Sequence, residues 1–187
     1  MDNLTIEEII VKRRSYRSLD TIKITEDIVN ELAKNAQLAP SCYNNQPWRF
    51  VFVYQDEQLS KLKTALSPGN KWALDSSMII AVCSRKDLDC DIKNREYFLF
   101  DTGMATAFIL LKATELGLVA HPIAGFDEDI AKKILEVPDD MQIITLIIVG
   151  KHSEAINQSL SPQQAQVEKE RPERLSLDKF AFYDTFK

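Results

Sequence analysis

The stretch from Arg95 to Leu116 constrains the fold more than any other part of the chain. Its periodicity is helical, but apolar residues occupy almost every side of it, which is typical of a helix buried all round. Gly117 follows at the position where glycine commonly ends a helix. The whole chain has 187 residues, the size of one ordinary domain. We therefore predict that a partner subunit covers one face of this helix.

The remaining patterns mix helices and strands without strict alternation. A capping box of Thr5 and Glu8 opens a short helix, Pro40 ends a second one, and Asp127 is a good N-cap for another. This mixture favours an α+β fold over a doubly wound sheet. The predicted helices are Thr5–Lys12, Thr25–Leu38, Glu57–Leu66 and Asp127–Leu135, and the predicted strands are Phe50–Tyr54, Met78–Cys83 and Ile143–Val149.

The composition changes after Gly150. Residues 154–171 are rich in Gln, Ser and charge and are too polar for a core, whereas residues 175–186 are apolar and aromatic again. We predict a core of residues 1–152 and an extended arm of residues 153–187. Such an arm with an aromatic anchor often lies on another subunit.

Charge and cysteine usage exclude several classes of protein. Lys and Arg number 23 against 28 Asp and Glu, a net charge of −5, so we expect neither nucleic-acid nor membrane binding. The longest uncharged run in the most apolar segment, residues 102–111, is far short of the roughly 20 residues that span a bilayer. Three cysteines without C-x-x-C spacing and two histidines predict no disulfide, no metal site and a cytoplasmic location.

Four basic and hydroxyl side chains lie just past the first predicted helix: Arg13, Arg14, Ser15 and Arg17. Guanidinium groups suit bidentate binding of a phosphate, and the serine hydroxyl adds a donor. The alternative is a solvated helix end whose cations complement the helix dipole. The residues alone leave both interpretations open.

Two loops could also hold a ligand. Residues 39–48 pack amide and hydroxyl groups between Pro40 and Pro47, which suits the edge of a polar heterocycle or simply a rigid turn. Cys42 in this loop is either a nucleophile or an inert thiol. Small residues before Asp127, at Ala124 and Gly125, allow close approach to the backbone. No Ser-His-Asp set or carboxylate pair is recognisable.

These segments together resemble the nitroreductase family of FMN-dependent oxidoreductases. Residues 13–17 look like its opening basic motif, and residues 40–48 look like its P-S-x-x-N-x-Q-P-W loop. Residues 101–105 look like the start of its long central helix, and residues 122–127 look like its P-I-x-G-F-D turn. Two departures are Cys42, where the family usually has Ser, and the short segment between Cys83 and Asp101.

The resemblance implies an intertwined homodimer around a mostly antiparallel sheet, with FMN bound at the interface. Arg13, Ser15 and Arg17 would hold the phosphate and ribityl end, with Arg14 alongside and Arg174 closing on the phosphate. Arg17 would also reach the N1/O2 side of the flavin, and Ala124 and Gly125 would offer N–H groups to N5. The other implied contacts come from the loop that faces the second subunit's FMN, from the pyrimidine edge and from the turn: Pro40, Ser41, Cys42, Asn44 and Gln46; Asn70 and Lys71; Pro122 and Ile123.

The implied activity is hydride transfer from NADH or NADPH through the flavin to an electron-poor acceptor such as a nitroaromatic or a quinone. No side-chain acid or base is needed, because the cofactor carries the chemistry. Two alternatives remain: the same fold with another reaction, such as reductive dehalogenation, and a flavin carrier or sensor without sustained turnover.

Overall fold

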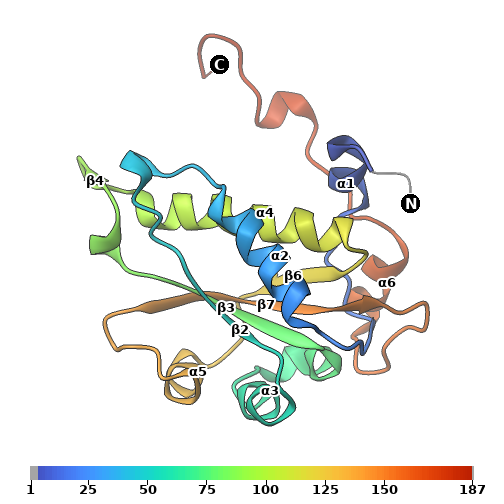
Figure 1. The fold of residues 1–187 in the computed structure, drawn as a ribbon. Helices are drawn as coiled ribbons and strands as arrows, with labels where there is room; N and C mark the ends of the chain where they lie inside the picture. The colour runs from blue at the N-terminus through green and yellow to red at the C-terminus, as the bar shows by residue number, and fades with distance from the viewer. Residues whose placement is uncertain (1–3, 187) are drawn as a thin grey trace.

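A five-stranded antiparallel sheet forms the centre of the computed structural model, which describes residues 4–186 (Figure 1). Strand β7 (Gln142–His152) pairs with β3 (Met78–Ser84) on one side, and with β6 (Val119–Ile123) and β1 (Leu19–Asp20) on the other. Strand β2 (Arg49–Val53) pairs with β3 at the edge. The predicted α+β class with an antiparallel sheet is confirmed.

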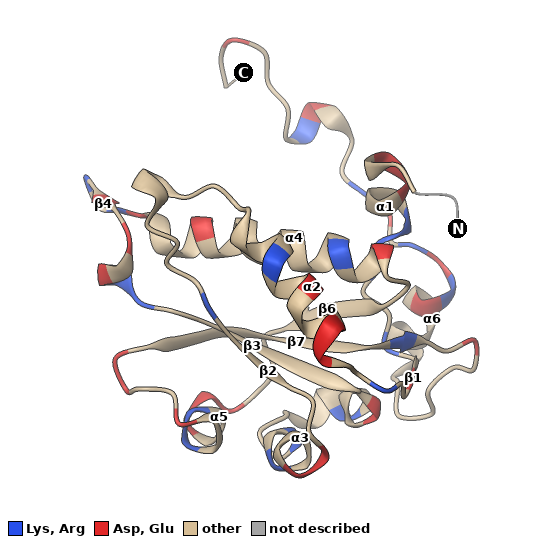
Figure 2. Cartoon of the chain, in the orientation of Figure 1, with Lys and Arg blue, Asp and Glu red and all other residues tan. Residues whose placement is uncertain are grey.

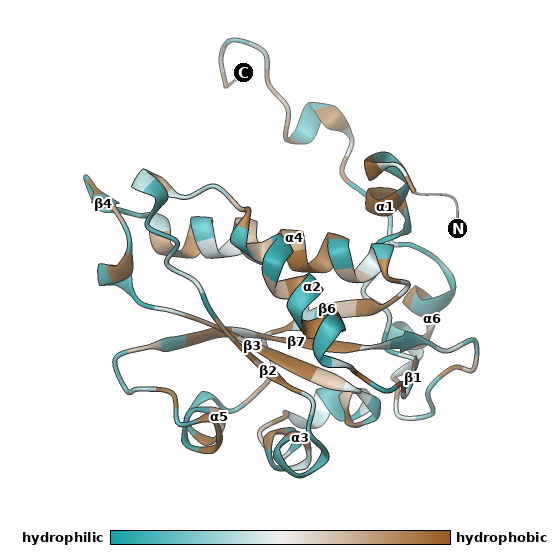
Figure 3. Cartoon of the chain, viewed as in Figure 1, coloured by the Kyte–Doolittle hydropathy of each residue, from teal (hydrophilic) through white to brown (hydrophobic). Residues whose placement is uncertain are grey.

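Both faces of the sheet are covered by helices, which explains why β3 is buried along its whole length. Alternate β3 residues point to opposite faces, with Ile80 in one core cluster and Ile79 in the other. Helices α2 (Glu26–Gln37) and α4 (Tyr97–Glu115) lie on one face (Figures 1 and 3). Helices α3 (Asp56–Lys63) and α5 (Glu128–Leu135) and the 3-10 helix η2 (Pro68–Asp75) lie on the other.

Side-chain caps set the starts of several helices. Thr5 and Glu8 form the predicted capping box of α1 (Ile6–Lys12), Thr25 caps α2, and Asp127 accepts a hydrogen bond from the Ile130 N–H at the start of α5. Charged side chains lie mainly on helices and loops rather than on the central strands (Figure 2). No helix among residues 4–186 is long and apolar enough to cross a membrane.

The long helix differs from its prediction at its start and on one side. It begins at Tyr97, because residues 91–96 form a small hairpin of β4 (Asp91–Ile92) and β5 (Arg95–Glu96). It is not buried all round in the single chain, since Phe100 is 64% exposed and Leu99 and Phe108 are also exposed. In α1, Ile6 and Ile10 are exposed and only Ile9 is buried. These helices therefore carry an uncovered apolar surface.

Part of the segment predicted as an extended arm, residues 153–187, is helical. Residues 162–169 form helix α6 (Pro162–Lys169), which opens with a capping box of Ser161 and Gln164. This helix packs on the chain's own N-terminal segment, and Glu168 is only 5% exposed. The prediction of an extended segment is thus wrong over residues 162–169, where the chain is helical and two backbone N–H groups satisfy the buried carboxylate. Beyond it the chain runs outward to the C-terminus (Figure 1).

Candidate active site

Arginines from two distant segments meet in one pocket of about 290 Å³. One segment follows α1, and the other lies in and after α6. Figure 2 shows basic residues at the base of α1 and beside α6. The structure thus brings together the predicted cluster and Arg174, and adds Arg171. The lining residues are Arg13, Arg14, Ser15, Arg17, Val167, Arg171, Pro172 and Arg174.

The pocket concentrates positive charge without acidic partners. None of the ion pairs found within residues 4–186 includes one of its arginines. Burial lowers the pKa of Arg13, and the nearby Arg171 and Arg174 lower it further. Arg171 donates to the carbonyls of Val11 and, at 3.0 Å, Arg13. Like charges held this close favour an anion between them, and guanidinium groups suit a phosphate.

Arg14 has a different role from its neighbours. Its guanidinium donates to the carbonyls of Val167 at 2.6 Å and Glu168 at 3.2 Å. It also lies 4.5 Å from the centre of the Tyr16 ring. The Glu168 carboxylate in turn accepts from the N–H groups of Arg17 at 2.8 Å and Ser18 at 2.9 Å. Arg14 and Glu168 therefore hold α6 against the basic segment, a role that the sequence did not indicate.

A chain of contacts leads from the arginines to the turn after β6. The Arg17 guanidinium lies 5.9 Å from the Trp72 ring centre, and Trp72 Nε1 donates to Asn70 Oδ1 at 3.2 Å. Asn70 Nδ2 donates to the Gly125 carbonyl at 2.8 Å. A Cβ at residue 125 would lie 2.6 Å from that nitrogen, so only glycine allows this close approach.

The turn itself offers unused backbone donors. In the loop and turn hydrogen bonds of residues 4–186, neither Ala124 nor Gly125 uses its N–H. Ile123 is a buried residue of the core, so its side chain is structural. Pro122 is half-buried and Lys71 is exposed. The turn therefore presents backbone rather than side chains.

His121 packs against Trp72 and contacts the backbone of Tyr16. Its ring stacks on Trp72 with centroids 4.7 Å apart, and Nδ1 lies 3.0 Å from the Tyr16 carbonyl. Burial lowers its pKa to about 4. The imidazole is therefore neutral at pH 7, and its hydrogen lies on Nδ1 because the Tyr16 carbonyl can only accept. We interpret His121 as a structural residue.

The loop of residues 40–48 lies elsewhere. The Cys42 N–H donates to Asp101 Oδ2 at 2.6 Å, near the start of α4. Three residues of the loop, Tyr43, Asn44 and Gln46, have positive φ, a strained conformation that clusters at functional sites. The Ser41 hydroxyl accepts from the Gln46 N–H at 3.0 Å. Pro40 is exposed, and no residue of this loop lines the arginine pocket.

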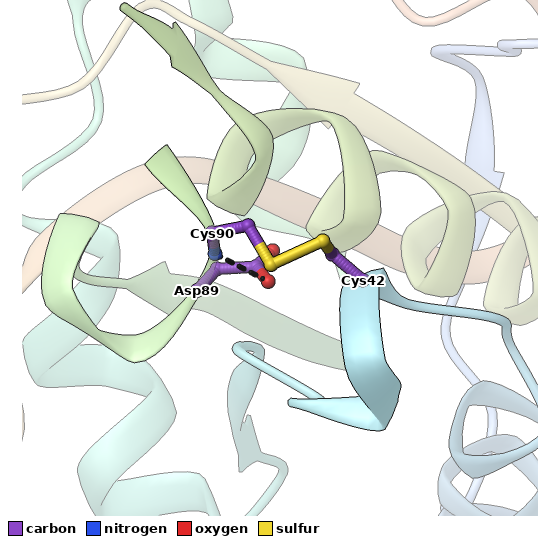
Figure 4. Close-up of side chains that lie close together, drawn as sticks. All are labelled: Cys42, Asp89 and Cys90. Atoms are coloured by element: carbon purple, nitrogen blue, oxygen red, sulfur yellow. Dashed lines mark hydrogen bonds between the residues drawn. A yellow bond between two sulfur atoms is a disulfide. The ribbon is translucent and has the colours of Figure 1, made fainter. Parts of the chain in front are cut away.

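The expectation of unpaired cysteines is wrong. Cys42 and Cys90 form a disulfide (Figure 4), with Cα atoms 6.2 Å apart. The pairing spans 48 positions, and an odd cysteine count does not show that two distant residues meet. Cys42 is therefore neither a free nucleophile nor an inert thiol. Cys83 is free and buried, and burial raises its pKa to about 11.

Comparisons with known proteins identify the family of this chain. The model of the nitroreductase family matches residues 10–71 and 67–151. A protein of Archaeoglobus fulgidus with the provisional name NADH dehydrogenase/NAD(P)H nitroreductase is 28% identical over 149 residues, which cover 76% of this chain and 83% of that protein. A crystal structure described as an oxidoreductase containing FMN has a TM-score of 0.84 and 26% identity, and covers 100% of this chain and 96% of its own. A nitroreductase family protein of Clostridium difficile has a TM-score of 0.77 and 25% identity, covering 97% and 99%. The chain belongs to the nitroreductase family.

Proposed function

We propose that this protein is an FMN-dependent oxidoreductase that uses NADH or NADPH to reduce an electron-poor acceptor. The observation that carries the proposal is the arginine pocket without acidic partners, joined through Trp72 and Asn70 to the free N–H groups of the turn at Gly125. A phosphate at one end and a planar heterocycle edge at the other would satisfy both. The similar crystal structure that contains FMN supports this assignment.

Different residues of the chain bind different parts of FMN in this proposal. Arg13, Ser15 and Arg17 bind the phosphate and ribityl end, with Arg171 and Arg174 closing from the other segment. Asn70 holds the turn, so that the Ala124 and Gly125 N–H groups point to the heterocycle. FMN, when bound, supplies the hydride chemistry at N5, while the protein supplies position and electrostatics. The absence of a recognised acid–base pair in the sequence fits this division.

A homodimer completes the site in this proposal. In one chain the arginine pocket lies beside α1, which packs on the C-terminal half of α4, whereas the loop of Cys42 lies at Asp101 near its N-terminus. Asp101 and Glu115 are about 21 Å apart along the helix axis at the usual rise. A two-fold partner covering the exposed α4 residues would bring Ser41 and Asn44 of the partner subunit to this chain's flavin.

The C-terminal segment fits the same assembly. Its apolar side chains are exposed in the single chain: Leu175, Leu177, Phe180, Phe182, Tyr183 and Phe186. An exposed aromatic segment that runs outward suits the surface of a second subunit. A groove of about 270 Å³ between α1 and α4, lined by Ile6 and Phe108, is available to receive apolar side chains. Light scattering of the full chain should therefore show a dimer, and Phe108→Asp should shift it to monomer.

We propose only the chemical class of the acceptor, which is a nitroaromatic, a quinone or another flat, electron-poor molecule. We also propose that the reaction takes place in the cytoplasm. Steady oxidation of NAD(P)H with an added quinone would separate this activity from a flavin carrier without turnover. Release of halide from a halogenated aromatic would favour the alternative of reductive dehalogenation on the same fold.

The first experiment is a visible absorption spectrum of the purified protein, repeated without oxygen after addition of NADH or NADPH. We expect a flavin spectrum that bleaches. A flavin spectrum that persists would favour a carrier or a different electron donor. A colourless protein that does not take up added FMN would overturn the proposal.

A pair of arginine variants tests the phosphate assignment. Arg17→Ala removes a pocket arginine, whereas Arg85→Ala removes an arginine that pairs with Asp87 and Asp140 outside the pocket. We expect only Arg17→Ala to lower FMN occupancy and the rate of reduction. If both quantities survive in Arg17→Ala, the phosphate assignment is wrong.

A further inference from the structure

Three potential metal ligands meet near the start of α4, outside the arginine pocket. The sulfur atoms of Cys42 and Cys90 and a carboxylate oxygen of Asp89 all lie within 4.8 Å of one another (Figure 4). Cys42 belongs to the 3-10 helix η1 (Cys42–Asn44), and Asp89 and Cys90 precede strand β4. Two separate segments therefore converge on one point.

Local hydrogen bonds fix the Asp89 carboxylate at this point. Its Oδ1 accepts from the Cys90 N–H at 2.8 Å and from Asn45 Nδ2 at 3.2 Å. The backbone of Cys42 is also fixed, because its N–H donates to Asp101 Oδ2 in α4. Three hydrogen bonds, two of them from backbone N–H groups, thus fix the positions of these groups.

The second carboxylate oxygen of Asp89 has no visible function in the disulfide form. Oδ2 is buried and has no hydrogen-bond partner within residues 4–186. A buried polar atom without a hydrogen-bond partner is unfavourable and calls for an explanation. Either a proton shared with the neighbouring Asp101 carboxyl or a bound cation would satisfy this oxygen.

We propose that the reduced protein binds one thiophilic divalent cation, Zn²⁺ or Co²⁺, through Cys42 Sγ, Cys90 Sγ and Asp89 Oδ2. Reduction by a dithiol transfers two electrons and two protons to the disulfide, giving two thiols and an oxidised dithiol. The cation then displaces the two thiol protons and forms two metal–sulfur bonds. Oxidation of the pair by a disulfide compound reverses both steps and releases the cation.

The chemistry and spacing suit such a cation. Zinc binds thiolate sulfur at about 2.3 Å and carboxylate oxygen at about 2.0–2.2 Å, so tetrahedral geometry separates two sulfurs by about 3.8 Å. Cα atoms 6.2 Å apart allow this separation by side-chain rotation. Softer thiolates select zinc and related metals over magnesium or calcium. The fourth position goes to water or to Asp101, which is 2% exposed. This site does not depend on the proposed function.

The test uses the full-length protein with whatever flavin it carries, reduced with a dithiol, freed of reductant under argon and titrated with Co²⁺. We expect one Co²⁺ per chain with the red ligand-field bands of tetrahedral cobalt, a region where oxidised flavin does not absorb. Zn²⁺ should displace it. The oxidised protein should give no such bands.

Matched variants identify the ligands. Cys90→Ser should abolish the tetrahedral bands, and Asp89→Asn should weaken Co²⁺ binding at least about tenfold, since even outer-shell partners of metal sites contribute this much. Cys83→Ala removes the buried free cysteine, and Asp87→Asn removes a nearby exposed carboxylate. Both controls should bind Co²⁺ like the unmodified protein.

Two results would overturn the proposal. One is a reduced protein that shows no thiolate-bound Co²⁺, in which case Asp89 and Asp101 only share a proton. The other is Asp89→Asn that binds as tightly as the unmodified chain. Circular dichroism and formation of the Cys42–Cys90 disulfide in oxidised Asp89→Asn would establish that this variant is folded.

Discussion

The arginine pocket and the Cys42–Cys90 cluster lie toward opposite ends of α4 and gather side chains of opposite charge. The pocket gathers arginines that form no ion pair with an acidic residue among residues 4–186. The cluster gathers the carboxyls of Asp89 and Asp101 beside a disulfide, and burial together with the Asp89 carboxyl raises the pKa of Asp101. Both are held by contacts between segments far apart in the sequence. The arginines of the pocket leave their charge available to a bound anion in the proposed function, whereas the two cysteines of the cluster are joined by a covalent bond.

This difference indicates that the two regions can be perturbed separately. The pocket depends on α6, which Glu168 ties to the N-terminal segment. The cluster depends on the disulfide and on the segment between η1 and α4. Changes in one region should leave the other intact in a single chain.

The largest effect is expected from removing charge on both sides of the pocket. The double variant Arg13→Ala/Arg171→Ala should raise the Kd for FMN at least about 100-fold, because two lost hydrogen bonds to charged groups, at roughly 1.5–3 kcal/mol each, together cost about 3 kcal/mol or more. Fluorescence titration with FMN measures this. The Cys42–Cys90 disulfide should still form, as thiol counting would show. An unchanged Kd would contradict the pocket's role.

Reducing the disulfide should lower the free energy of unfolding by about 3–4 kcal/mol in metal-free buffer. The bond closes a segment of 48 positions, and a crosslink of this length restricts the unfolded chain by about that amount. Urea denaturation with and without dithiol measures the difference. Adding Zn²⁺ to the reduced protein should restore part of it if the metal site exists. The same shift in Cys42→Ser without dithiol would assign the effect to this bond.

Loss of the Glu168 carboxylate should cost about 2–3 kcal/mol of unfolding free energy. Glu168→Ala leaves the N–H groups of Arg17 and Ser18 without their acceptor in a buried place. Urea denaturation of this variant is compared with Glu170→Ala, which removes an exposed carboxylate two positions on. Equal midpoints for the two variants would show that α6 is not held through Glu168.

The smallest effect concerns pH. The folded pKa of His121 is about 4 against an ordinary value of 6.5, so the unfolded chain binds the extra proton first. The stabilising contribution is present above pH 6.5 and is lost as the pH falls toward 4. Between pH 7 and pH 5 the free energy of unfolding should drop by about 2 kcal/mol through this residue.

A non-titrating ring tests the assignment to His121. His121→Phe should flatten this part of the pH dependence, measured by urea denaturation at several pH values. His152→Phe, which replaces an exposed histidine, should leave it unchanged. A full pH-dependent drop in His121→Phe would contradict the assignment.

Sequence patterns formed by neighbouring residues predicted much of the fold. The caps at Thr5 and Asp127 and the apolar runs of β3 and β7 were readable, because each depends on neighbouring residues. The basic segment could be recognised as a candidate phosphate site. In its second half, Arg174 was implied by the family resemblance. Arg171 and the support from Glu168 could not be predicted, because they contact residues over 150 positions away.

The chain's sequence by itself determined the helix caps, the two buried central strands and the residue types of each motif, since these follow from local hydrogen bonding and hydrophobic periodicity. Only the tertiary structure decided which motifs meet. It placed the arginines with α6, separated them from the Cys42 loop along α4, and paired Cys42 with Cys90. The physical reason is that packing of the sheet and its helices sets these distances, and no local pattern encodes a distance between remote segments.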